Sequence, residues 1–236
     1  MRSHKGRQAP VRRMVVLLGL LLVTLLGSSG PAAGFSSATV VFSGSRAHKV
    51  VALTFDDGWS PQNCLKIYNT LVSKHVTATW FPNAVYMVHA TALWHKIAAK
   101  FPIANHTYDH PWLTNLGYFQ IRWQLSHDEV LAEQIIGHQM VKVFRPPYGA
   151  YNSTVLRAAG SLGYTKAIMW DVDDGDTQGA SSVSAIVHNA TKGTNGSIVL
   201  MHCGPSLTPS AVPLIIDSYR RRGFTFVTIP QLLALH

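Results

Sequence analysis

Acidic side chains are scarce in this sequence. Eleven Asp and Glu stand against 20 Lys and Arg, which gives a formal charge of +9. Such a charge is typical of nucleic-acid-binding proteins, but five of the basic residues precede Met14 and no acid precedes Asp56. From Phe35 onward the excess is only +4. Nucleic acid is therefore not the expected partner.

Charged residues are few overall, at 13%, while apolar residues reach 47%. This composition excludes an intrinsically disordered chain and a coiled coil. A length of 236 residues suffices for one large domain with a buried core. The sequence shows no internal repeat, low-complexity segment or linker.

Long apolar runs are absent except near the N-terminus. There a basic stretch ending at Arg13 leads into an apolar run, Met14 to Leu26, and then into small residues up to Gly34. This order is that of a secretory signal peptide, and the run is shorter than the roughly 20 residues that span a bilayer. We expect residues 1–34 to be a signal peptide cleaved after Gly34, rather than an uncleaved anchor. The mature chain would be secreted and would have no membrane span.

Only two cysteines occur, Cys64 and Cys203, and they lie 139 residues apart. A secreted chain meets oxidising conditions, which favour pairing where the geometry allows it. Separation along the sequence does not show proximity in space. A disulfide and two buried thiols both remain open on this ground.

Short apolar runs alternate with amphipathic stretches beyond residue 46. The predicted strands are Val50–Phe55, Ala78–Phe81, Ile103–Asn105, Val141–Phe144, Ala167–Trp170, Ser197–Met201 and Thr225–Ile229. The predicted helices are Pro61–Lys74, Thr91–Lys100, Phe119–His138, Ser153–Leu162, Val183–Thr191 and Ser210–Arg222. This alternation predicts an α/β fold with about seven parallel strands and helices outside them.

Two architectures fit this alternation. A complete (β/α) barrel needs about 250 residues, so a mature chain of this length favours a trimmed barrel, with an open doubly wound sheet as the alternative. No Gly-x-Gly-x-x-Gly follows the first predicted strand, and no Walker pattern occurs. Nucleotide binding therefore has no support in the sequence.

The few acids concentrate where the predicted strands end. Seven of the 11 follow the carboxyl ends of strands, and they are Asp56, Asp57, Asp109, Asp171, Asp173, Asp174 and Asp176. In either architecture the working groups collect at these ends. We therefore expect a functional site there.

His106 and His110, also at a strand end, are four residues apart and could share one ion with a nearby carboxylate. Two histidines and one carboxylate satisfy zinc with an open position, and also suit non-haem iron. The α/β pattern favours zinc or a similar divalent ion. Adjacent Asp56 and Asp57 diverge in extended chain, so one could bind metal while the other accepts a proton. His202 is then the candidate general acid of a metal-assisted hydrolysis.

Five motifs in this order resemble those of the polysaccharide deacetylases of carbohydrate esterase family four. They are Thr54-Phe55-Asp56-Asp57-Gly58, His106-Thr107-Tyr108-Asp109-His110, Arg145-Pro146-Pro147-Tyr148, Asp173-Asp174-Gly175-Asp176 and Leu200-Met201-His202. The resemblance runs from about Val50 to Leu235. It implies a distorted, incomplete (β/α) barrel of about seven parallel strands, with residues 35–49 as a lead-in segment and residues 50–236 as the catalytic domain.

The resemblance also implies a role for each motif residue. Asp56 would be the catalytic base, oriented by Arg145, and His202 the acid that protonates the leaving amine. Tyr148 would offer its backbone N–H to the developing oxyanion. The metal ligands would be Asp57, His106 and His110.

The fourth motif departs from the family pattern, because Thr177 stands where the family usually has Trp. Asp176 occupies the position of the acid that raises the pKa of the catalytic histidine. The absent Trp puts the substrate groove in doubt more than the chemistry. Trp59, Tyr108 and Trp112 could instead supply a face on which sugars stack.

The motifs also bear on the cysteines, because Cys64 follows the first and Cys203 directly follows His202. If both motifs surround one site, the two thiols are expected to form a disulfide.

The sequence thus predicts a secreted, monomeric, zinc-dependent hydrolase that removes N-acetyl groups from a β-linked N-acetylglucosamine polymer or oligomer of chitin or peptidoglycan type. The alternatives are an O-acetyl esterase acting on acetylated xylan, a deacylase of small non-sugar substrates, and a non-catalytic cell-wall carbohydrate-binding protein. The last alternative would predict damage to the base, acid or ligands, and none is damaged.

Overall fold

The computed structural model describes residues 36–235. The predicted signal peptide, residues 1–34 with cleavage after Gly34, lies outside the described residues. Within the described part, no helix has both the length and the apolar character needed to cross a membrane.

Nine strands and eight α-helices make up residues 36–235. The strands are β1 (Thr39–Val41), β2 (Val50–Asp57), β3 (Thr79–Pro82), β4 (Ala104–Asn105), β5 (Val141–Phe144), β6 (Lys166–Ile168), β7 (Val172–Asp173), β8 (Ser197–His202) and β9 (Thr225–Phe226). The helices are α1 (Pro61–Ser73), α2 (Ala84–Met87), α3 (Thr91–Ala98), α4 (Tyr118–Ile136), α5 (Ser153–Gly160), α6 (Val183–Ala190), α7 (Thr208–Arg221) and α8 (Ile229–Ala234). Two short 3-10 turns, Leu113–Asn115 and Pro147–Gly149, lie between them.

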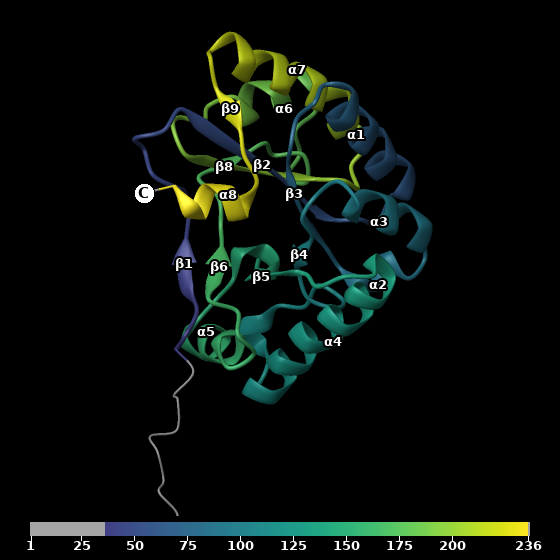
Figure 1. Ribbon diagram of the computed structural model, residues 1–236, viewed down its shortest axis with the longest axis vertical. Helices are drawn as coiled ribbons and strands as arrows, with labels where there is room; N and C mark the ends of the chain where they lie inside the picture. The colour runs from purple at the N-terminus through teal and green to yellow at the C-terminus, as the bar shows by residue number, and fades with distance from the viewer. Residues whose placement is uncertain (1–35, 236) are drawn as a thin grey trace, which may run out of the picture. The chain divides into compact units, whose positions relative to one another are not determined.

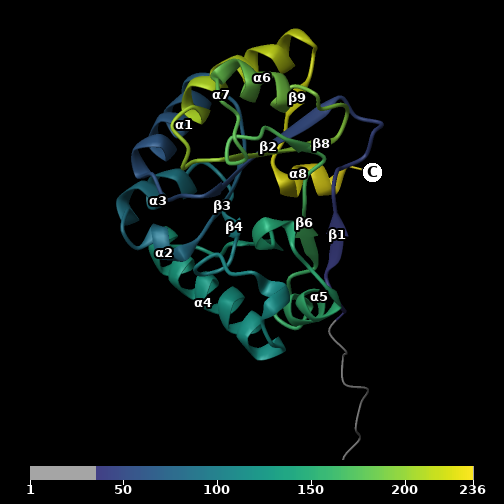
Figure 2. The same ribbon diagram turned by 180° about the vertical axis from the view of Figure 1, so that it is seen from behind.

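The strands form two sheets, and every ladder pairing is parallel. One sheet has the order β1-β6-β5-β4, and the other has β3-β2-β8-β7, with β9 also on β2. A bridge between Trp80 and Ile103 joins β3 to the region of β4, and the chain passes from one sheet to the other between β6 and β7. The fold is therefore an α/β fold with an incomplete (β/α) barrel, as the sequence predicts. Figures 1 and 2 show α7, α1, α3, α2 and α4 following one another along its outer side.

Strand β2 is central because its sequence, VVALTFDD, suits a strand covered on both faces. All its residues from Val51 to Asp57 are buried. It pairs with β3, β8 and β9, and its register places Asp56 opposite Phe81 on one side and His202 on the other. The carboxyl ends of these strands consequently meet at one place.

The structure differs from the predicted elements in a few short segments. Strands β1 and β7 were not predicted, and β1 falls in the expected lead-in segment. The predicted strand Thr225–Ile229 stops at Phe226, and α8 begins at Ile229. The cause is a capping box, in which Thr228 accepts from the N–H of Gln231 while the Gln231 side chain accepts from the N–H of Thr228. The β-branched run conceals this helix start.

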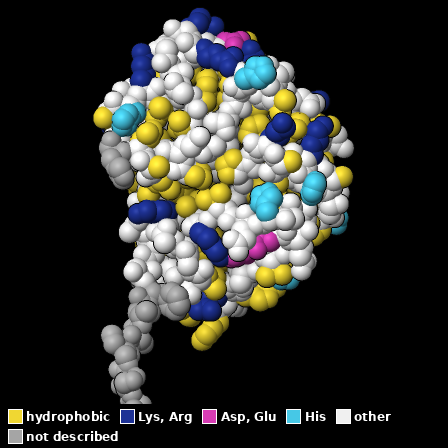
Figure 3. Space-filling view, in the orientation of Figure 1, with side chains coloured by type: hydrophobic (Ala, Val, Ile, Leu, Met, Phe, Trp, Pro, Cys, Tyr) yellow, Lys and Arg dark blue, Asp and Glu magenta, His cyan; other side chains and the backbone are white. Residues whose placement is uncertain are grey.

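Basic side chains lie in several separate places on the face seen in Figure 3, and acidic side chains are few there. The described residues on this face therefore carry no continuous basic surface.

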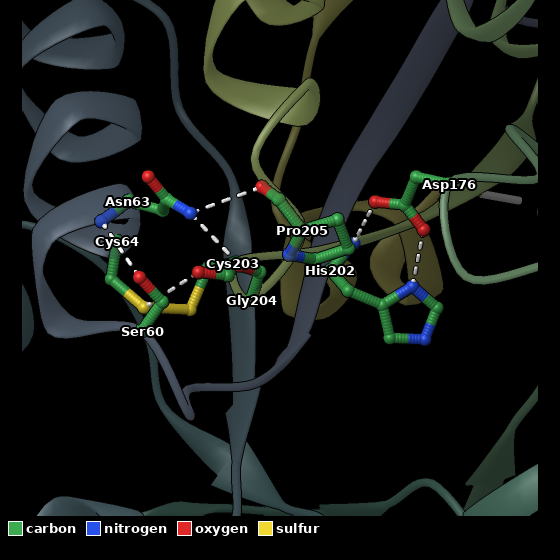
Figure 4. Close-up of a disulfide and its surroundings, with 8 residues drawn as sticks. All are labelled: Ser60, Asn63, Cys64, Asp176, His202, Cys203, Gly204 and Pro205. Carbon is green, nitrogen blue, oxygen red and sulfur yellow. Dashed lines mark hydrogen bonds and ion pairs between the residues drawn. A yellow bond between two sulfur atoms is a disulfide. The ribbon is translucent and has the colours of Figure 1, made fainter. Parts of the chain in front are cut away.

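A disulfide joins Cys64 in α1 to Cys203 after β8 (Figure 4). Both residues are fully buried. The N–H of Cys203 also donates to the carbonyl of Asp56 at 3.2 Å. The disulfide thus ties the start of α1 to the segment that carries His202.

Replacing both cysteines, Cys64→Ala with Cys203→Ala, should lower the free energy of unfolding by about 2–5 kcal/mol, because the bond closes a long loop in the unfolded chain. Guanidinium unfolding of the variant and the parent measures this. An exposed pair on the same helix, Asn69→Ala with Ser73→Ala, serves as the control. A loss no larger than that of the control would contradict the prediction.

Candidate active site and metal centre

The two carboxylates at the end of β2 have different surroundings. Asp56 is the last β2 residue paired with β8, whereas Asp57 has a φ of 71°, outside the extended region. Gly58 follows with a φ of +112°, where a Cβ would lie 2.6 Å from the ring of Trp94. The divergence expected for extended chain therefore does not apply at Asp57, and an oxygen of each carboxylate lies near Nε2 of His106, at 3.7 Å for Asp56 and 3.6 Å for Asp57.

The Asp57 carboxylate lies beside His106 and His110. Its Oδ1 is 3.6 Å from Nε2 of His106 and 3.5 Å from Nε2 of His110. Thr107 and His110 both have positive φ, 72° and 62°, so the segment after β4 bends sharply and directs both imidazoles inward. The three groups form one of two clusters among the described residues with the donor set for a metal ion.

The protonation of these histidines suits a metal. Burial lowers the pKa of His106 and of His110 to about 3, so both rings are neutral at pH 7. Nδ1 of His106 lies 2.8 Å from the carbonyl oxygen of Arg145 and must carry the proton to donate to it. Nε2 is thereby left unprotonated, as in metal-ligating histidines. Burial also raises the pKa of Asp57 to about 7. The free Nε2 of His106, the neutral ring of His110 and the Asp57 carboxyl in its ionised form make a donor set that fits zinc.

Asp56 is held by a fully buried Arg145. Nη1 of Arg145 donates to Oδ1 of Asp56 at 2.7 Å and to Oγ1 of Thr54 at 2.8 Å. The guanidinium also donates to two carbonyls of the β6 region, Ile168 and Met169. Burial raises the pKa of Asp56, and the charge of Arg145 opposes that rise. The second oxygen, Oδ2, lies 3.7 Å from Nε2 of His106, on the side of the candidate metal ligands.

Asp176 holds His202. Its Oδ1 is 2.6 Å from Nδ1 of His202, and its Oδ2 accepts from the N–H of His202 and from Oγ1 of Thr208. Burial alone would lower the pKa of His202, but the hydrogen bond and charge of Asp176, with Asp56 and Asp57, raise it to about 9. The ring is therefore protonated at pH 7 and can donate a proton from Nε2, which lies 4.0 Å from Oδ2 of Asp57.

Tyr148 adopts a φ of 60° within the turn Pro147–Gly149. Its ring stacks on Trp112, with centroids 4.1 Å apart, and meets the ring of His110 at 4.5 Å. Tyr148 and Trp112 are both about half exposed. This stacked pair continues the surface beside the candidate metal ligands.

These groups surround one pocket of about 460 Å³. The predicted residues that line it are Asp56, Asp57, Trp59, His106, His110, Tyr148 and His202. Arg145 and Asp176 lie behind this lining and act on it through Asp56 and His202. The arrangement brings together a carboxylate, a protonated imidazole and a set of candidate metal ligands, which suits metal-assisted hydrolysis.

Tyr108 does not line the pocket, contrary to the sequence prediction. Its ring packs against Trp123 and His127 of α4, with centroids 5.5 Å and 4.7 Å away. Successive residues of the motif point in different directions, so the histidines face the pocket while Tyr108 faces the helix. Trp112 is also absent from the lining and reaches it only through Tyr148.

Four of the seven strand-end acids, Asp109, Asp171, Asp173 and Asp174, do not line the pocket. Asp109 accepts from Gln124, Asp173 from Gly175 and Gln178, and Asp174 from the N–H of Asp176. Asp171 accepts from the N–H of Ile198 and pairs with Arg46. The strand-end position alone therefore predicts too many functional acids. Some side chains at the strand ends face the pocket, and others hydrogen-bond to the surrounding backbone and side chains.

Tyr86, Trp170 and Gln178 also line the pocket and were not predicted. Trp170 ends the strand-like run Ala167–Trp170, and Gln178 follows the fourth motif closely. Both could have been found by extending the strand-end rule past the motifs. Tyr86 lies on α2, a four-residue helix too short for a periodic pattern to predict.

Comparison with known proteins decides the family. A family model described as polysaccharide deacetylase matches residues 43–167, more than half of the chain. The chain belongs to the polysaccharide deacetylase family.

This chain, a member of the polysaccharide deacetylase family, has relatives of different lengths. It is 35% identical over 182 residues to the bifunctional xylanase/xylan deacetylase of Cellvibrio japonicus, covering 76% of this chain and 27% of that protein. It is 29% identical over 222 residues to the peptidoglycan-N-acetylglucosamine deacetylase of Bacillus cereus, covering 87% and 76%. The crystal structure of the Bc1960 peptidoglycan N-acetylglucosamine deacetylase matches with a TM-score of 0.78 at 30% identity, covering 85% of this chain and 94% of that one. The chain thus spans about a quarter of the Cellvibrio protein and most of the other two.

His110→Ala should lower the Zn²⁺ affinity of this chain by more than about 100-fold. Loss of a residue that only hydrogen-bonds to a metal ligand already lowers metal affinity by about 10–100-fold, and His110 is itself a candidate ligand. Competition with a chelating dye measures the affinity. His127→Ala, which alters a histidine stacked on Trp123, is the matched control and should bind Zn²⁺ as the parent does. Equal affinities of the two variants would refute the assignment.

Asp176→Asn should return the pKa of His202 from about 9 to its ordinary value of 6.5 or below, because burial remains while its main charged partner is lost. A raised pKa stabilises the fold below pH 6.5, and this contribution is lost as the pH rises through about 9. The variant should therefore lose less stability across that interval than the parent. NMR titration of His202 in metal-free protein, with unfolding at several pH values, measures both effects. An unchanged pKa would show that Asp176 does not set it.

Proposed function

We propose that this chain is an exported, metal-dependent hydrolase that removes N-acetyl groups from a β-linked N-acetylglucosamine polymer or oligomer of chitin or peptidoglycan type. The observation that carries the proposal is one pocket that combines a carboxylate held by a buried arginine, a protonated histidine and a His-His-Asp ligand set. We further assign residues 1–34 to the signal peptide and 50–236 to the catalytic domain, and expect a monomer.

Asp57, His106 and His110 would hold the metal, most suitably Zn²⁺. When bound there, Zn²⁺ supplies a Lewis acid for the acetyl carbonyl and lowers the pKa of water. The donor set and the neutral histidines support this assignment.

The proton transfers belong to the chain's own residues. Asp56 takes a proton from the attacking water at Oδ2, since Oδ1 is engaged by Arg145. His202 gives a proton from Nε2 to the leaving amine, and Asp176 keeps the imidazolium oriented through Nδ1. We assign the backbone N–H of Tyr148, whose φ of 60° departs from the extended chain, to the developing oxyanion.

The relatives support the substrate class. Proteins named peptidoglycan-N-acetylglucosamine deacetylase and chitooligosaccharide deacetylase match 87% and 76% of this chain. The xylan deacetylase relative, at 35% identity, favours O-acetyl xylan as the second candidate, because base, acid and metal serve esters and amides alike. The presence of Asp56, His202 and the three candidate ligands in the pocket lining supports a catalytic role over a non-catalytic one.

Asp56→Asn should lower acetate release at least 10³-fold while Zn²⁺ affinity changes little, because the amide cannot accept the proton. Acetate is measured over chitooligomers, peptidoglycan and acetylated xylan, each with and without chelator.

Asp109→Asn, an acid of the same strand-end group bound to Gln124, is the control and should retain activity. Turnover by Asp56→Asn at the parent's rate would contradict the assignment of Asp56 as the base. Release of acetate from acetylated xylan alone would instead support the O-acetyl esterase.

A further inference from the structure

Trp59 rests on a glycine from a distant segment. A Cβ built on Gly204 would lie 1.7 Å from Cε2 of Trp59 and 2.0 Å from its Cζ2. Gly204 is not among the glycines with positive φ, so its backbone does not require glycine. The requirement is space, because any side chain at position 204 would displace the indole.

Helix α1 holds the segment that contains Gly204 through two adjacent residues, Asn63 and Cys64 (Figure 4). Nδ2 of Asn63 in α1 donates to the carbonyls of Gly204, at 2.8 Å, and of Pro205, at 3.2 Å. The preceding residue, Cys203, is bonded to Cys64 of the same helix. Helix α1 itself begins two residues after Trp59, with Ser60 as its N-cap. The indole and its support are therefore anchored to one helix end.

Much of the indole is exposed. Trp59 is 42% exposed although one face covers Gly204, and it lines the pocket. Its ring centroid lies 6.3 Å from that of His202. A flat apolar surface thus stands next to the imidazole that faces the leaving group.

We propose that Trp59, supported by Gly204, is a platform on which a pyranose ring of the substrate stacks. This inference rests on the proposed function and deepens it, since it selects a sugar chain over a small acetylated amine. The C–H face of a pyranose is apolar and flat, and an aromatic ring held in advance binds it without a loss of side-chain freedom. The stacked sugar is either the one whose acetamido group lies beside His202 or the adjacent sugar of the chain.

The test uses binding, so that it does not depend on turnover. Tetra-N-acetylchitotetraose is titrated calorimetrically into Zn²⁺-loaded Asp56→Asn protein, and into the same protein with a second change. Adding Trp59→Ala should raise Kd about tenfold or more, while Trp59→Phe should recover most of the affinity. Gly204→Ala should also raise Kd, because it displaces the indole without removing it. Trp123→Ala is the matched control, since Trp123 is 50% exposed and lies outside the pocket lining.

A Kd for Trp59→Ala within twofold of the parent, an equal rise with Trp123→Ala, or no binding by the parent would each overturn the platform. KM and kcat of the single variants with intact Asp56 separate the two proposals. A tenfold rise in KM with kcat within threefold supports the platform. If the protein with intact Asp56 shows no turnover but Trp59→Ala still raises Kd, the platform is supported and only the proposed catalysis is refuted.

Discussion

The ion pair between Asp56 and Arg145 is the interaction on which the site depends. A buried charge is tolerated only when it is paired and its other hydrogen-bonding groups are satisfied. Arg145 is fully buried, and its guanidinium meets Asp56, Thr54 and the carbonyls of Ile168 and Met169. One side chain from the end of β5 therefore binds β2 in one sheet and the β6 region of the other. Loss of Arg145 would leave the charge of Asp56 uncompensated at the junction of the two sheets, whereas an Asn at position 56 keeps an oxygen that can accept the hydrogen bond from Arg145.

The same residue acts on the candidate metal ligands through its backbone. The carbonyl of Arg145 accepts from Nδ1 of His106 and so determines which nitrogen of that ring faces Asp57. The guanidinium meanwhile engages one oxygen of Asp56 and leaves the other toward the pocket. Arg145 therefore sets both the orientation of the Asp56 carboxylate and the tautomer of His106.

Much of the fold and site could be predicted from the sequence. The periodicity of residues 50–226 predicted the order of the principal strands and helices, and the strand-end positions of the Asp56-Asp57 and His106-His110 pairs pointed to one edge of the sheets. The failures were short elements and side-chain directions. Strands of two or three residues, such as β7, bury too little of their own sequence to leave a pattern. Tyr108 was misplaced because a sharp backbone turn, not alternation, sets its direction.

The kinds of chemical group, their order along the chain and their gathering at the carboxyl ends of parallel strands were determined by the sequence alone. Only the tertiary structure decided which acids face the pocket, that Cys64 meets Cys203, and that Trp59 lies on Gly204. The reason is physical. Strand periodicity is a local property of a few residues, whereas these contacts join segments about 140 residues apart, as the separation of the disulfide shows, and depend on how β2 and β8 align.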